Sequence, residues 1–169
     1  FPDIFDMPGV DILIPDFDYL LKNSHKIKGV FITHGHEDHV GAVPNLLMEL
    51  PNVPIYASKL VGEFLKVKLS EKAFSEVGRN FSYHLFGPDS GVVDLGHFKM
   101  SAFRINHSIP ESMGLVINTP EGVLVHLADY KFDENPVLDK PADVDTIERL
   151  GREGVLCLIS DCLGITSEG

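Results

Sequence analysis

Few cysteines, few basic residues and no long hydrophobic run occur in the 169-residue sequence, and each shortage excludes a class of protein. The two cysteines, Cys157 and Cys162, are too few and too close for a disulfide framework, so we expect a reducing compartment, the cytoplasm. No apolar run approaches the roughly 20 residues that cross a bilayer, which predicts no membrane partner. Lys and Arg total 14 against 25 Asp and Glu, which gives a net charge of -11. This charge argues against a protein that binds nucleic acid through a basic surface alone.

Internal repeats and low-complexity segments are also lacking, while a composition of 44% hydrophobic and 23% charged residues is typical of a globular domain. The sequence starts at Phe1 without an initiator Met and stops at Gly169 without an ending signal. We therefore expect a fragment of a longer protein.

Two strand–helix pairs are predicted in the first half of the chain. Residues 27–33 form a β-branched apolar run typical of a strand, followed by a polar loop and helical spacing within residues 41–50. Residues 54–57 predict a second strand. Ser58 is the expected N-cap of an amphipathic helix that continues to Lys68.

The second half of the chain is predicted to be rich in strands. Alternating hydropathy and turn residues predict mostly antiparallel strands at 81–86, 91–95, 97–106, 113–119 and 122–129. After a short helix at 146–151, the wholly apolar residues 155–160 predict a strand in the middle of a covered sheet, with Cys157 in the core. The fold class is therefore α/β, a layered sandwich without an internal linker.

The most informative segment is THGHEDH, residues 33–39, because it places four metal-competent side chains within six positions between a strand and a helix. His34 and His36 are two apart on extended backbone, so they can share one ion. Asp38 and His39 begin the next helix and can hold a second ion. A polar loop with surface histidines is the alternative, and this spacing disfavours it.

A catalytic zinc site needs more ligands than one loop supplies, so distant donors are required. His107 follows the strand at 97–106, and Asp129 follows the strand at 122–129, where each could face the loop. A carboxylate at Asp129 could bridge two cations. Each residue alone is more typical of a turn, but their order behind the HxHxDH loop favours ligands.

These segments resemble the metal motifs of the metallo-β-lactamase superfamily. The sequence around them is similar to that of the ribonuclease J branch of the β-CASP nucleases. HGHEDH, the His of NHSIPES and the Asp of LADYKFD match its second, third and fourth metal motifs. MPGVDILIPDFDYL, VGAVPNLL, DYKFDENPV and LISD carry the narrower similarity. The resemblance implies an αββα sandwich with one zinc on His34, His36 and His107, a second zinc on Asp38 and His39, and Asp129 as the bridge.

The resemblance also implies parts that this chain lacks. The family's first motif would precede Phe1, and its fifth motif follows the β-CASP domain. We therefore expect an incomplete sandwich, with the first strands and the β-CASP domain missing. Residues 1–161 would be a partial metallo-β-lactamase domain, and residues 162–169 would start the connection toward the absent domain.

The implied activity is zinc-dependent hydrolysis of RNA phosphodiester bonds, 5′ to 3′ exonucleolytic and endonucleolytic, with Asp38 as the catalytic residue that orients water or accepts its proton. RNA is the expected partner, and the full-length protein could be a homo-oligomer. Two alternatives remain open. One is a metallo-hydrolase acting on a thioester, lactone or β-lactam, and the other is an inactive metal-binding fragment.

Overall fold

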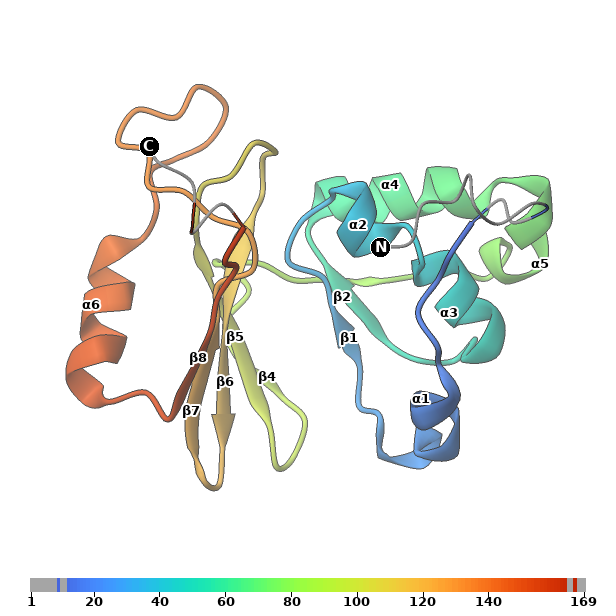
Figure 1. Cartoon of the computed structure of the whole chain (residues 1–169). Coiled ribbons are helices and arrows are strands. Elements are labelled where there is room, and N and C mark those ends of the chain that lie inside the picture. Colours follow the sequence, from blue (N-terminus) through green and yellow to red (C-terminus); the bar gives the residue numbers. More distant parts are fainter. Residues whose placement is uncertain (1–8, 10–11, 164–165, 167–169) are drawn as a thin grey trace.

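The chain folds into two β-sheets stacked face to face, with helices on both outer faces, in a computed structural model that describes residues 9, 12–163 and 166 (Figure 1). The first sheet is parallel, in the order β1 (Val30–Phe31), β2 (Ile55–Ala57) and β3 (His84–Leu85). The second sheet has the order β4 (Val93–Asp94), β5 (Lys99–Arg104), β6 (Met113–Thr119), β7 (Gly122–His126) and β8 (Cys157–Ile159). Its pairs are antiparallel except for β7 with β8.

Helices occur where parallel strands require long connections, because a hairpin cannot join parallel neighbours. Between β1 and β2 lie α2 (Glu37–Val40) and α3 (Val43–Glu49), and between β2 and β3 lie α4 (Lys59–Leu69), η3 (Lys72–Phe74) and α5 (Ser75–Gly78). α6 (Val144–Glu153) connects β7 to β8, and α1 (Asp18–Lys22) and η2 (Ser24–Lys26) precede β1. α3, α4 and α5 cover the first sheet, while α6 covers the second (Figure 1).

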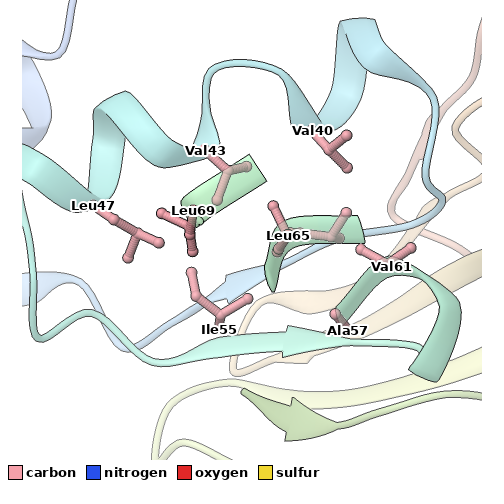
Figure 2. Close-up of a cluster of buried hydrophobic side chains, with 9 residues drawn as sticks. Val40, Val43, Leu47, Ile55, Ala57, Val61, Leu65 and Leu69 are labelled. Atoms are coloured by element: carbon pink, nitrogen blue, oxygen red, sulfur yellow. The ribbon is translucent and has the colours of Figure 1, made fainter. Parts of the chain in front are cut away.

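Three hydrophobic clusters fill the three spaces between these four layers. Figure 2 shows the first cluster, in which Ile55 of β2 packs against Leu65 and Leu69 of α4. The second cluster lies between the two sheets and contains Phe86, Met100, Met113 and Leu115. The third joins the second sheet to α6 and contains Phe103, Val116, Val125 and Leu150. β5 and β6 contribute to two clusters each, because successive side chains on a strand point to opposite faces.

The start of α4 follows the sequence prediction closely. Ser58 is extended, and its hydroxyl accepts a hydrogen bond from the Val61 N–H at 3.4 Å. The Leu60 N–H donates to the carboxylate of Glu111 at 2.8 Å. Two of the helix's unpaired N-terminal donors are thereby satisfied, one of them by the loop that follows β5.

The structure contradicts two expectations for the strands. β3 belongs to the parallel sheet and pairs with β2, although alternation had placed residues 81–86 in an antiparallel series. β8 pairs only with β7 among the described residues, and all three of its residues, including Cys157, are exposed rather than central in a covered sheet. Hydropathy indicates which faces can be buried, but not which strand lies alongside.

In the described part of the chain, no helix has the length and apolar character needed to cross a bilayer. Most of the predicted connection at 162–169 lies outside the described residues. The domain boundary at residue 161 stays a prediction.

The buried face of α4 gives a direct test of the first cluster. Leu65 is 0% exposed, whereas Val67 on the same helix is 70% exposed. Leu65→Ala should lower the free energy of unfolding by about 2–5 kcal/mol, because it leaves a cavity. Val67→Ala should change it by less than about 0.5 kcal/mol. Urea unfolding of both variants measures the difference, and equal losses would contradict the packing.

Candidate metal centre

Four imidazoles and two carboxylates meet where the ends of three strands come together. His34 and His36 lie on the loop after β1, and Asp38 and His39 lie on α2, whose N-cap is His36. The second sheet contributes His107, which follows β5, and Asp129, which follows β7. The structure therefore brings together all six side chains named in the sequence analysis, from both sheets.

The first group of donors comprises His34, His36, His107 and Asp129, each offering one atom within 4.8 Å of the others. His107 Nε2 lies 3.0 Å from His36 Nδ1 and 3.5 Å from Asp129 Oδ2. His34 Nε2 lies 3.9 Å from the same Asp129 oxygen. Metal–ligand bonds of 2.0–2.1 Å in a tetrahedral site separate neighbouring donors by about 3.3 Å, close to these spacings.

The second group comprises Asp38, His39 and Asp129. His39 Nε2 lies 3.4 Å from Asp129 Oδ1 and 3.6 Å from Asp38 Oδ2. Asp129 thus directs Oδ2 toward the first group and Oδ1 toward the second. One carboxylate facing two donor groups is the arrangement by which a pair of cations is bridged.

The burial and protonation state of His34 indicate that the cluster suits a cation. Its side chain is fully buried, and its Nε2 has no hydrogen-bond partner among the described residues. Burial, reinforced by the charge of neighbouring His39, lowers the pKa of His34 to about 4, so the ring is neutral at pH 7. A neutral imidazole with an unsatisfied buried nitrogen is well suited to bind a metal ion, because a lone pair without a partner is costly to bury.

Thr33 fixes the other side of this ring. Its hydroxyl lies 3.1 Å from His34 Nδ1, and both side chains are buried. If Nδ1 carries the proton and donates it to Thr33, Nε2 is left with its lone pair facing Asp129. The Thr33 oxygen is therefore an available acceptor for the tautomer whose Nε2 could bind a cation.

Backbone geometry positions two further residues of the site. A Cβ on Gly35 would lie 2.9 Å from the ring of Phe64, so any larger residue between His34 and His36 would force that ring to move. Ala128 has a φ of 54°, a left-handed conformation that costs an L-residue roughly 1–2 kcal/mol. This strained residue immediately precedes Asp129, whose carboxylate faces both donor groups.

Sequence reasoning did not identify Thr33 or two other residues around the centre. Ser108 Oγ lies 3.4 Å from His36 Nε2, and Lys68 of α4 pairs with Glu37 at 2.6 Å, which ties the metal loop to that helix. Thr33 adjoins the motif and Ser108 follows His107, so proximity to the predicted ligands was the available signal. Nothing in the sequence pattern pointed to Lys68.

Comparison with known proteins places this geometry in a family. Residues 7–149 match the beta-lactamase superfamily domain. The chain belongs to the metallo-β-lactamase superfamily. Solved structures agree on the fold: a metallo-beta-lactamase fold protein, YhfI from Bacillus subtilis, is 21% identical with a TM-score of 0.51, covering 70% of this chain and 47% of that one. An Enterococcus faecalis V583 protein of unknown function has a TM-score of 0.58 at 17% identity, covering 96% and 43%.

Within this superfamily, the chain is similar in sequence to proteins named ribonuclease J. It is 42% identical over 168 residues to Ribonuclease J of Thermus thermophilus, which covers 96% of this chain and 29% of the relative. Ribonuclease J 1 of Streptococcus pyogenes is 41% identical, covering 92% and 27%, and Ribonuclease J2 of Bacillus subtilis is 36% identical, covering 92% and 27%. The chain spans less than a third of the length of these relatives. The predicted resemblance and the αββα fold are both confirmed.

The contact between the Thr33 hydroxyl and His34 Nδ1 predicts a change in metal affinity. Thr33→Val keeps the shape of the side chain but removes the oxygen, so the divalent-cation affinity should fall about 10- to 100-fold. Thr33→Ser retains the oxygen and should bind metal nearly as tightly as the original protein. Competition against a chromophoric chelator measures both affinities. Unchanged affinity in Thr33→Val would show that the hydroxyl does not position His34.

The lowered pKa of His34 predicts acid sensitivity of the metal-free protein. The folded value of about 4 lies below the ordinary value of 6.5, so the unfolded chain binds a proton first as the pH falls. Stability is unaffected by this residue above pH 6.5 and declines between pH 6.5 and 4, by about 1.4 kcal/mol per pH unit. Urea titrations across this range should give a flatter profile for His34→Leu, which lacks the group.

Proposed function

We propose that the chain forms part of a metal-dependent ribonuclease that hydrolyses RNA phosphodiester bonds. The observation that carries this proposal is Asp129, whose two oxygens face separate donor groups, in a chain whose relatives are named ribonuclease J. His34, His36 and His107 would hold one zinc ion, Asp38 and His39 a second, and Asp129 would bridge them. Two bound cations would supply acidified water and positive charge for the phosphate oxygens.

The chain's own residues support this chemistry in distinct ways. Asp38 is the proposed catalytic residue, because its exposed carboxylate can both touch the cation site and reach water outside it. It would orient the attacking water and accept its proton. Ser108 adjoins His36 at the mouth of the site and can donate a hydrogen bond to a phosphate oxygen.

The proposed compartment is the cytoplasm. Cys157 and Cys162 are both free and exposed, which suits reducing surroundings. The proposed modes of cleavage are 5′ to 3′ exonucleolytic and endonucleolytic. The small-molecule hydrolase and the inactive metal-binding fragment are the competing outcomes of the test below.

Hydrolysis of a labelled 5′-monophosphorylated RNA by the purified chain tests the proposal. We expect one divalent ion per chain and partial occupancy of the second position, which has fewer donors, by elemental analysis. Cleavage should be abolished by a chelator and restored by zinc, with mononucleotides together with internal fragments among the products. Asp129→Asn should lower both metal content and cleavage. Asp38→Ala should lower turnover at least 100-fold while leaving the ion on His34, His36 and His107 bound.

Each contrary result identifies a different error. Full turnover in Asp38→Ala with normal zinc content would remove its catalytic role. Metal binding without RNA cleavage would favour the inactive fragment, and turnover of a thioester or β-lactam in place of RNA would favour the small-molecule hydrolase.

A further inference from the structure

A cavity adjoins the metal centre and shares His107 and Ser108 with it. Its volume is about 210 Å³, and it lies between the loop that carries His107 and the loop that follows Asp129. The apolar part of its wall is formed by Ile109 and Pro110 on one side and by Pro136, Val137 and Leu138 on the other.

The walls of this cavity are held in place by Asn106, which is only 3% exposed. Its carbonyl oxygen accepts a hydrogen bond from the Lys131 N–H at 2.7 Å. Its side chain donates to the Lys140 carbonyl at 3.0 Å and accepts from the Ala142 N–H at 2.9 Å. Asn106, which precedes the proposed ligand His107, therefore holds both ends of the loop at residues 131–142 by hydrogen bonds. The cavity is preformed for this reason.

The acidic side chains at the cavity are already neutralised. Asp133 pairs with Lys131 at 2.9 Å, and Asp139 accepts a hydrogen bond from the Glu111 N–H at 3.2 Å with Arg104 3.6 Å away. What remains unpartnered is apolar: Val137 is 94% exposed and Leu138 is 79% exposed. Adjacent large apolar side chains left in water next to a site commonly mark a binding surface.

We infer that this cavity receives the base of the nucleotide whose phosphate lies at the metal centre. The inference rests on the proposed function and adds a base-binding subsite to it. Of the three parts of a nucleotide, only the base is apolar on its faces, while the ribose and phosphate are hydrophilic. The volume is below the roughly 300–1,000 Å³ of pockets for drug-sized ligands, which suits a single ring system.

Continuity with the metal centre places this base next to the scissile bond. Ser108 lies against His36 at 3.4 Å and also lines the cavity, so a phosphate at the cations and a base in the cavity belong to neighbouring parts of one nucleotide. Apolar contact with a base face does not depend on base identity, so the subsite favours single-stranded RNA without choosing a sequence.

A double-mutant cycle between protein and RNA tests the subsite. The protein is the metal-loaded chain, compared with Val137→Ser/Leu138→Ser and with Val92→Ser, a control that changes an apolar residue 62% exposed near β4. The probes are fluorescent 5′-monophosphorylated RNA pentanucleotides with phosphorothioate linkages, in which one base at a time is replaced by an abasic ribose. Affinity is measured by fluorescence anisotropy, and metal content by elemental analysis.

We expect one abasic position to weaken binding to the original chain about tenfold. The double variant should bind the intact RNA about tenfold more weakly and show no further loss at that position, with unchanged metal content. Val92→Ser should behave like the original chain.

Two results would overturn the inference while leaving the proposed function in place. One is RNA binding by the double variant that matches the original chain or falls equally for every probe. The other is a change in oligomeric state of the double variant on size-exclusion chromatography, which would assign the cavity to contact between copies. Failure of the original chain to bind any probe would overturn both the inference and the proposed function.

Discussion

A neutral, fully buried imidazole with an unsatisfied nitrogen sets the requirements of the site. Leaving the Nε2 of His34 without a partner costs free energy, typically about 1–3 kcal/mol for a buried polar atom. The surroundings maintain that state: β1 and the packed sheets exclude water, and Thr33 occupies the opposite ring nitrogen. The strained backbone at Ala128 adjoins Asp129 and Gly35 lies between His34 and His36, so both residues shape the loops that carry the donors.

Local signals in the sequence were enough to predict much of the fold. The N-cap at Ser58 and the helix that follows it were predicted correctly because a helix start is specified by adjacent residues. The strands at 113–119 and 122–129 were predicted for a similar reason, since alternation is a property of the strand itself, although the second strand ends at His126. The partner of β3 and the exposure of β8 were wrong, because pairing depends on residues far away in the chain.

The candidate site likewise contains residues that local sequence signals predict and residues that they do not. Residues 34–39 could be grouped from their spacing alone, whereas His107 and Asp129 were connected to them only through their order and the family resemblance. The structure brings them together, but their roles as ligands stay predictions. Thr33 was overlooked because its contribution depends on a ring orientation that only packing determines.

The acidic surface of the chain does not contradict an anionic substrate. At physiological ionic strength, exposed charges are screened beyond about 8 Å, so much of the net charge of -11 is weak at the centre. Two divalent cations would contribute four positive charges at the point where a phosphate binds, and these act at short range. Attraction would thus be local, and long-range steering would be slight.

The donors come from both halves of the sandwich, His34 to His39 from the first sheet and His107 and Asp129 from the second. A bound cation would therefore act as a staple across the interface between the sheets. Its binding free energy would add to the stability of the folded chain, in proportion to the logarithm of the free metal concentration. Scarcity of metal in a cell would then lower both the stability of the folded chain and its activity. The rate at which the polypeptide is degraded would thereby depend on the supply of metal.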